Sequence, residues 1–406
     1  MIDLIVRNAH LRDRDGLWDI GISGQSIAAI ERRITADARI ENLEGRLVLP
    51  GFCDTHVHLD KACLLGRSDH RHGALAGAIA AISRLKAGFT AEDVYARGAR
   101  CLEMAIVQGT THMRTHVEID PVIGLRAFEA IRQLRDDYRW ALDLSICVFP
   151  QEGLLNNPGT DELMVMALEG GADLVGGCPY TDSDPHAHVA RIFDLAERFD
   201  IDIDFHLDFD LDPGWMHLDA VLAETRARER GGRVAVGHAT KLSALAPAPL
   251  AQVMARLADA GVAVTALPAT DLYLMGRDHT ENVPRGVAPV HRLAEGGVCC
   301  SIATNNVLNP FTPFGDFSLL RMANLYANVC HAGPDRFAQV LDLITTSPAR
   351  LLNLPDYGTR VGAVADLVVL DAPDQIEALG ALAMPLFALK RGRKTFARAR
   401  PELMAP

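Results

Sequence analysis

The chain lacks an excess of basic residues, and it also lacks long uninterrupted apolar stretches. Lysine and arginine number 40 against 52 acidic residues, which gives a formal net charge of −12. This balance argues against nucleic acid or an anionic membrane as a partner. No stretch reaches the ~18 consecutive apolar residues of a membrane-spanning helix. The first residues, MIDLIVRN, lack the basic start and apolar core of a signal peptide. We therefore expect neither a membrane nor a nucleic acid as a partner.

Paired cysteines are missing as well. The eight cysteines are scattered along the chain, and none forms a Cys-x-x-Cys pair. Several of them lie in apolar, strand-like stretches, namely Cys147, Cys178, Cys299 and Cys300. Reduced cysteines in the core are therefore expected. Together with the lack of an export signal, they predict a cytoplasmic protein.

Size and composition are those of an ordinary globular enzyme. Hydrophobic residues make up 49% of the chain and charged residues 23%. A length of 406 residues allows one large domain, or a large domain with a small one.

Both ends of the chain have the pattern of short strands joined by turns. Strands are expected at residues 4–7, 18–22, 26–30 and 46–49, and again at 366–371, 386–391 and 394–398. Neither end holds enough apolar residues to form a domain alone. We therefore predict that residues 1–50 and 357–406 together form one small β-sandwich, which requires the two ends to meet in space.

Strand-like and helix-like segments alternate between the two ends. The strand candidates are residues 53–58, 111–118, 142–149, 174–178, 201–208, 233–240, 262–267 and 298–304. Helical patterns fall between them, for example at 161–169, 188–198, 219–230 and 250–260. Eight such repeats predict an α/β fold, a closed (β/α)8 TIM barrel over residues 51–356. A doubly wound open sheet is the alternative, but no Gly-x-Gly-x-x-Gly motif follows an early strand.

His56 and His58 stand two residues apart at the end of the first barrel strand. Side chains at positions i and i+2 of a strand point to the same face, so the two imidazoles can chelate one metal ion. A buried apolar strand has no packing use for such a pair, and unpaired ring nitrogens would cost free energy. The alternative is a pair of surface histidines with ordinary hydrogen bonds.

Polar residues close most of the predicted barrel strands. In a parallel barrel the C-terminal strand ends meet around one mouth, where active sites lie. The residues that share this position are His56 and His58; Arg114, His116 and Glu118; Gln151 and Glu152; His206, Asp208 and Asp210; His238, Thr240 and Lys241; and Thr304, Asn305 and Asn306. Four of these six strand ends carry histidine, which favours one shared site.

Along nearly its whole length, the chain resembles the amidohydrolase superfamily. The resemblance lies in His56, His58, His206 and His238 and in the closing segment at residues 362–370. Within the superfamily the chain is similar to the branch of cytosine deaminase and N-isopropylammelide amidohydrolase, on the stretches at residues 114–118, 148–153, 171–177 and 310–315.

That resemblance implies a (β/α)8 barrel flanked by a β-sandwich that both termini build. It implies one divalent metal ion held by His56, His58 and His206, with zinc as the first choice and iron or manganese as alternatives. His238 would stand beside the reacting group, and Gln151 would hydrogen-bond a polar edge of the substrate ring. A homo-oligomer is compatible with this branch.

Two positions depart from the deaminase pattern. Cytosine deaminase has a glutamate three residues after the strand-five histidine, where this chain has Phe209. The strand-eight aspartate of the family, a metal ligand and proton acceptor, aligns with Asn305. Asparagine is neutral, is a weaker ligand and cannot accept that proton at neutral pH. Cytosine deamination by the usual route is therefore not expected.

Another carboxylate is available for proton transfer. Asp208 lies two residues after His206 and hence on the same face of the strand, which makes it our candidate acid/base residue or extra ligand. The alternative is that Asp208 caps a helix or is solvated in the loop before Pro213. Asn305 and Asn306 are candidate substrate-binding amides.

These residues predict a metal-dependent hydrolase of a non-peptide C–N bond in a small nitrogen compound. The favoured substrates are cyclic: a pyrimidine, triazine, pterin or cyclic amide. His238 would orient water or stabilise the oxyanion, Asp208 would pass the proton to the leaving nitrogen, and Gln151 would position the ligand. Because two family carboxylates are missing, the alternative is a non-hydrolytic barrel that binds a ligand with a weak or absent metal site. A third possibility is other metal-dependent chemistry, such as C–C cleavage or isomerisation.

Overall fold

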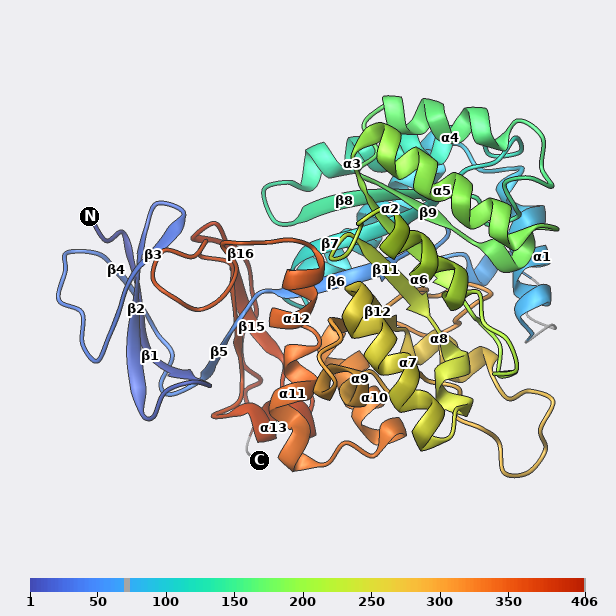
Figure 1. Cartoon of the computed structure of the whole chain (residues 1–406). Helices are drawn as coiled ribbons and strands as arrows, with labels where there is room; N and C mark the ends of the chain where they lie inside the picture. Colours follow the sequence, from blue (N-terminus) through green and yellow to red (C-terminus); the bar gives the residue numbers. More distant parts are fainter. Residues whose placement is uncertain (69–73, 405–406) are drawn as a thin grey trace.

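The computed structural model describes residues 1–68 and 74–404. A parallel barrel surrounded by helices lies beside a second sheet, which contains both ends of the chain (Figure 1). Within the described residues, the barrel strands are β6 (Phe52–Val57), β7 (Thr110–Glu118), β8 (Asp143–Phe149), β9 (Leu174–Gly177), β10 (Asp202–Leu207), β11 (Val234–His238), β12 (Val262–Ala266) and β13 (Cys300–Ile302). They follow each other around the sheet in chain order. The predicted (β/α)8 barrel is confirmed, with strand ends that differ from prediction by two residues at most.

Asn305, which follows β13, closes the barrel. Its backbone pairs in parallel with Val57 of β6. The Asn305 N–H donates to the carbonyl of His56 at 2.9 Å, and the N–H of His58 donates to the carbonyl of Asn305 at 3.0 Å. This closure fixes the end of strand eight directly against the His-x-His segment.

Amphipathic helices cover the outside of the barrel. In the described parts of the chain they are α1 (Leu75–Lys86), α2 (Ala91–Ile106), α3 (Arg126–Tyr138), α4 (Thr160–Glu169), α5 (Pro185–Phe199), α6 (Leu218–Ala227), α7 (Pro247–Ala260), α8 (Pro268–Leu274), α9 (Val290–Glu295), α10 (Leu319–Cys330), α11 (Phe337–Asp342), α12 (Thr346–Leu351) and α13 (Gln375–Gly380). Short 3₁₀ turns lie at Leu65–Arg67, Pro179–Thr181, Thr240–Ala244 and Pro334–Arg336. None of the helices described at 1–68 and 74–404 is long and apolar enough to cross a membrane.

The terminal sheet joins the first and last strands of the chain. Its strands are β1 (Leu4–Leu11), β2 (Leu17–Ser23), β3 (Ser26–Glu31), β4 (Arg39–Asn42), β5 (Leu47–Pro50), β14 (Leu367–Leu370), β15 (Pro385–Lys390) and β16 (Arg393–Ala397). β5 pairs antiparallel with β14, which unites the two chain ends as predicted. The sheet folds back on itself: Ser26 of β3 forms an antiparallel bridge with Val364, and the N–H of Ile27 in β3 donates to the carbonyl of Ala363 at 2.8 Å. The predicted sandwich of both termini is thus confirmed. The largely exposed β4 was not expected from the sequence.

The terminal sheet is fixed to the bottom of the barrel at the start of β7. Gly109 has φ 89°, and a Cβ placed on it would lie 2.6 Å from Cγ2 of Val368, so only glycine fits there. Nearby, the buried Lys390 Nζ lies 2.6 Å from Asp366, 2.7 Å from Asp143 and 3.1 Å from the carbonyl of Thr111. This cation links β15 to barrel strands β7 and β8. The boundaries 1–50, 51–356 and 357–406 remain predictions.

Candidate metal centre

Three histidine rings converge at the C-terminal ends of β6 and β10. The Nε2 atom of His206 lies 3.0 Å from Nε2 of His56 and 3.0 Å from Nε2 of His58. All three side chains are buried. A single N–H on His206 can point at only one of its two neighbours, so hydrogen bonding alone does not satisfy the cluster. Nitrogens around a tetrahedral ion with bonds of about 2.0–2.1 Å lie at a similar spacing. These two pairs therefore fit one divalent metal ion, while the three histidines of the described chain whose ligand atoms all lie within 4.8 Å of one another are His56, His206 and His238.

The three rings are neutral at physiological pH. Burial lowers the pKa of His58 and of His206 well below the usual imidazole range. Burial, with a smaller effect of His116, lowers the pKa of His56 to about 3. Neutral imidazole is the form that binds a metal, so the cluster needs no deprotonation before it does so.

Asp204 lies behind the cluster, two residues before His206 on β10. Its Oδ1 is 3.6 Å from Nδ1 of His56 and 3.6 Å from Nε2 of His116, while Arg114 donates to its Oδ2 at 2.8 Å. Burial alone would raise the pKa of Asp204, but His116 and Arg114 hold it well below its usual range. The result is a buried negative charge behind the His56 ring, at a distance longer than a hydrogen bond.

His116 also supports the cluster. Its ring stacks on His56 with a centroid distance of 3.8 Å and an interplanar angle of 28°. Phe149, at the end of β8, stacks on His206 at 4.6 Å and 14°. The rings of His56 and His206 are thus each held by a stacking contact, which limits their rotation.

His238, at the end of β11, is held from two sides. Its Nδ1 lies 2.6 Å from Oδ1 of Asp271, which is the only ion pair of Asp271 in the described part of the chain. Phe209 stacks on the His238 ring at 3.6 Å and 24°. One ring nitrogen from each of His56, His206 and His238 lies within 4.8 Å of the other two. His238 therefore belongs to the same centre as the three converging rings.

Both asparagines after β13 are buried, but their side chains differ. The amide nitrogen and oxygen of Asn305 lack a hydrogen-bond partner among residues 1–68 and 74–404. Asn306, in contrast, accepts from the Nδ2 of Asn309 at 2.7 Å. A buried amide without partners costs free energy unless something else binds it, so Asn305 is available to a ligand or a metal.

Asp208 makes the contacts of a helix cap. Its two oxygens accept from the backbone N–H groups of His217 at 2.8 Å and Leu218 at 3.1 Å, at the start of α6. It also has φ 49°, a left-handed backbone conformation. This arrangement is the alternative that the sequence left open. Each oxygen of Asp208 therefore accepts one backbone hydrogen bond.

Gln151 lies beside a buried lysine at the same mouth. Its Oε1 accepts from Lys61 Nζ at 3.3 Å, and its Nε2 contacts the sulfur of Cys178 at 3.4 Å. Lys61 also forms a 3.1 Å ion pair with Glu118 and lies 5.0 Å from the centre of the Phe149 ring. Since Phe149 stacks on His206, the Lys61–Gln151 pair borders the histidine cluster.

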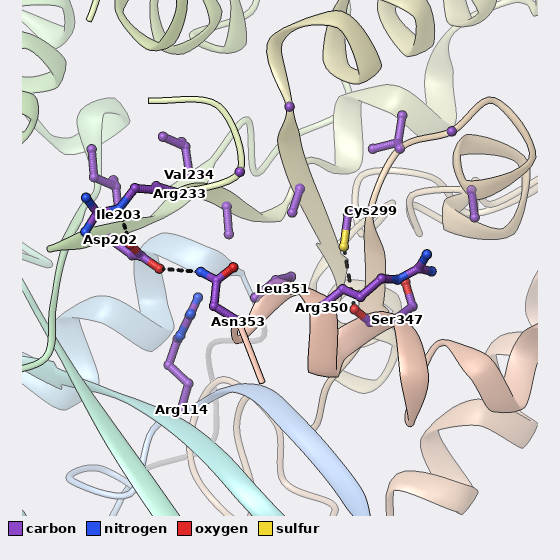
Figure 2. A pocket seen from close by; sticks show the side chains of 17 residues that line it. Arg114, Asp202, Ile203, Arg233, Val234, Cys299, Ser347, Arg350, Leu351 and Asn353 are labelled. Carbon is purple, nitrogen blue, oxygen red and sulfur yellow. Dashed lines mark hydrogen bonds and ion pairs between the residues drawn. The ribbon is translucent and has the colours of Figure 1, made fainter. Parts of the chain in front are cut away.

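A separate cavity of about 300 Å³ lies at the opposite, N-terminal end of the barrel strands. Figure 2 shows Arg114 directed toward it, with Asp202 accepting from Asn353 at 3.0 Å. Its lining includes the strand-start residues Ile203 and Val234. This end of a (β/α)8 barrel serves stability rather than catalysis, so we assign the chemistry to the histidine end.

Two carboxylates of the centre were missing from the sequence prediction. Asp204 could have been found, because it stands at i−2 from His206 and so shares its face of the strand. Asp271 could not, because it comes from α8, after a strand that closes without a polar residue. The contact to His238 across 33 positions exists only in the folded chain.

Comparisons with known proteins agree with this geometry. A match to the amidohydrolase family covers residues 99–381. N-isopropylammelide isopropyl amidohydrolase of Pseudomonas sp. (strain ADP) is 29% identical over 96% of this chain and 96% of that protein. Pterin deaminase of Rhizobium rhizogenes is 30% identical over 92% of this chain and 87% of that protein.

A solved structure resembles the whole fold. It is 5-methylcytosine deaminase from Klebsiella pneumoniae with bound 5-fluorocytosine, with a TM-score of 0.94 and 30% identity. The match covers 99% of each chain. With a family match over more than half of its length and relatives at this level of identity, the chain belongs to the amidohydrolase family.

Proposed function

We propose that this protein is a metal-dependent hydrolase that cleaves a non-peptide C–N bond in a small cyclic nitrogen compound. One observation carries the proposal: His56, His58 and His206 bring neutral Nε2 atoms together, 3.0 Å apart in two pairs, at the catalytic end of a (β/α)8 barrel. Relatives named for amidohydrolase or deaminase activity on ammelide, pterin and methylcytosine rings support the reaction and substrate class.

In this proposal His56, His58 and His206 hold one divalent ion, with zinc as the first choice because imidazole suits it. When bound, such an ion lowers the pKa of water and polarises the bond under attack. Asp204 places a negative charge 3.6 Å from Nδ1 of His56, and His116 restrains that ring by stacking. Asn305 supplies an unpaired amide to the substrate or the ion.

The substrate is proposed to lie between the histidines and the Lys61–Gln151 pair. Gln151 can exchange its weak contact with Cys178 for a hydrogen bond to a ring nitrogen or carbonyl. The ammonium of Lys61 favours a carbonyl or anionic ring edge at this side. Asp208 keeps its capping contacts and is a weaker candidate for proton transfer than the sequence indicated.

The test is an assay for released ammonia or amine over a panel of pyrimidines, triazines, pterins and cyclic amides. The purified, zinc-loaded protein is expected to release one nitrogen product from at least one ring class, and a chelator is expected to stop the release. The matched control is the His206→Ala variant, which removes the nitrogen shared by both short contacts. Tight binding of a ring compound without release would instead favour a non-hydrolytic binding barrel and would contradict the proposal.

A further inference from the structure

Asp271 uses both of its carboxylate oxygens on N–H donors. Oδ2 accepts from the backbone N–H of Leu267 at 3.0 Å, and Oδ1 faces Nδ1 of His238 at 2.6 Å. The residue is fully buried in the first turn of α8. Within the described chain it forms no ion pair with lysine or arginine. A carboxylate anchored in this way accepts a hydrogen bond from Nδ1 of His238, so the ring hydrogen of neutral His238 stands on Nδ1 and Nε2 keeps its lone pair.

The free nitrogen of His238 belongs to the metal centre. A ring nitrogen of His238 lies within 4.8 Å of the ligating nitrogens of His56 and His206. Because Asp271 occupies Nδ1, the nitrogen left for the centre is Nε2. It has no hydrogen-bond partner among the described residues. Phe209 stacks on the ring at 3.6 Å and prevents it from turning away.

Other groups near the centre are held by their own contacts. Oδ2 of Asp204 receives a 2.8 Å hydrogen bond from Arg114, while its Oδ1 has no hydrogen-bond partner among the described residues and lies 3.6 Å from His56 and from His116. Both oxygens of Asp208 accept from backbone N–H groups. Asn305 carries an amide, which does not accept a proton at neutral pH. In His238, the hydrogen bond at Nδ1 and the stacked Phe209 ring together fix the direction of Nε2.

We propose that Asp271 is a positioning residue that holds His238 with its hydrogen on Nδ1, so that Nε2 accepts and returns the proton during C–N hydrolysis. This inference rests on the proposed function. Water gives a proton to Nε2 while its oxygen bonds to the ring carbon, and Asp271 stabilises the imidazolium that forms. The same proton then passes to the leaving nitrogen as the C–N bond breaks, so that ammonia or an amine departs and the ring keeps the oxygen.

The first test is ¹⁵N NMR of the zinc-loaded protein with labelled histidine, which needs no substrate. The His238 signals are identified by their loss in His238→Gln. A hydrogen on Nδ1 is expected, and in Asp271→Asn it is expected to move to Nε2. The asparagine of that variant has a single carbonyl oxygen, which can accept from the N–H of Leu267 or from Nδ1 of His238. If the oxygen stays on Leu267, the NH₂ group faces the ring and donates to Nδ1.

A matched control comes from another buried histidine–aspartate pair, His188 and Asp182. His188 Nδ1 lies 2.5 Å from Asp182, and its Nε2 accepts from the N–H of Cys178 at 3.0 Å. His188 therefore serves as the internal reference for a ring with its hydrogen on Nδ1. The Asp182→Asn substitution is expected to leave the His238 signals unchanged. A hydrogen on Nε2 in the wild-type His238, as when a protonated Asp271 donates to Nδ1, would contradict the proposal.

The second test uses the substrate found by the release assay. Asp271→Asn is expected to lower kcat by about 10- to 100-fold with KM, zinc content and Tm close to wild type. In a His238→Gln background the same change is expected to have no further effect, since Asp271 acts through that ring. The proposal would be overturned if Asp271→Asn lowered kcat by the same factor in the His238→Gln background, or if it changed KM and left kcat unaltered. If no substrate is cleaved, the proposed function fails while the NMR result still decides the role of Asp271.

Discussion

At the scale of single residues, the centre is notable for its lack of charge. Three neutral imidazoles converge beside Asn305, whose amide has no partner among the described residues, and the carboxylates Asp204 and Asp271 stand behind His56 and His238. A neutral ligand set binds a divalent ion less strongly than one with a carboxylate in it. The identity of residue 305 should therefore set metal affinity more than fold stability.

Asn305→Asp is expected to raise the affinity for zinc by about tenfold at neutral pH, because it adds a carboxylate where the amide has no partner. Competition with a chelator measures the change. The control is Asn306→Asp, one position further along, where the side chain is already bonded to Asn309. Equal affinities of both variants would show that residue 305 does not reach the ion.

At the scale of elements, buried ion pairs attach the helices and loops around the mouth. Lys86, the last residue of α1, is buried and lies 2.7 Å from Glu118 and 2.5 Å from Glu152, with Asp120 also in contact. Burial alone would lower the pKa of Lys86, but these carboxylates raise it above its usual range. One cation thus joins α1 to the ends of β7 and β8.

Lys86→Met is expected to lower the free energy of unfolding by about 3–5 kcal/mol, because it leaves three carboxylates without their buried counter-ion. Chemical denaturation measures this change. Lys394→Met is the control, since Lys394 is exposed and pairs with Glu41 at 2.9 Å at the surface. Its effect should stay below about 1 kcal/mol. Similar losses in the two variants would contradict the assignment of Lys86 as a buried anchor.

Asp182 joins the loop after β8 to α5. Burial alone would raise its pKa, but hydrogen bonds from His188 and from three backbone amides lower the pKa to about 2. Because the folded pKa lies below the unfolded one, the ionised form stabilises the fold above about pH 4. That contribution is lost as the pH falls toward 2.

The Asp182→Asn variant cannot ionise at this position. After allowance for partial exposure, the free energy of unfolding of the wild type should exceed that of the variant by about 1–2 kcal/mol at pH 6. This difference should shrink as the pH falls from 4 to 2. Urea denaturation at several pH values measures the free energy of unfolding of the wild type and of the variant. A difference that stays constant with pH would mean that the charge of Asp182 does not contribute.

At the scale of the whole molecule, the chain folds as a barrel with a sheet from both termini attached beside the start of β7 (Figure 1). Lys390 joins the two parts through Asp366 and Asp143, and Val368 packs against Gly109. Contacts of this kind couple the stability of the two parts.

The coupling predicts a single unfolding transition. Trp18 is the tryptophan of the terminal sheet, while Trp140 and Trp215 belong to the barrel segment. A variant with Trp140→Phe and Trp215→Phe therefore reports on the terminal sheet alone by fluorescence. Its midpoint in urea should coincide with that of far-UV circular dichroism, which follows the whole chain. Two separate midpoints would show that the parts unfold independently.

Much of this arrangement was predictable from the sequence because barrel strands are short, apolar and regularly spaced. The eight strand positions and the convergence of His56, His58 and His206 follow from period-two geometry and from the rule that strand ends meet at one mouth. Side-chain contacts that no such geometric rule describes could not be predicted from the sequence. Asp271 reaches His238 from a neighbouring helix, and Asp208 turns to cap α6 because of its left-handed backbone.

The central claim is that three imidazoles hold one metal ion, and X-ray absorption of the zinc-loaded protein tests it most directly. We predict one zinc per chain with about three nitrogen ligands at about 2.0–2.1 Å. His206→Ala should lose the bound zinc, whereas His186→Ala, at an exposed position on α5, should keep it. Full zinc occupancy in His206→Ala, or a zinc environment without imidazole nitrogens, would contradict the account.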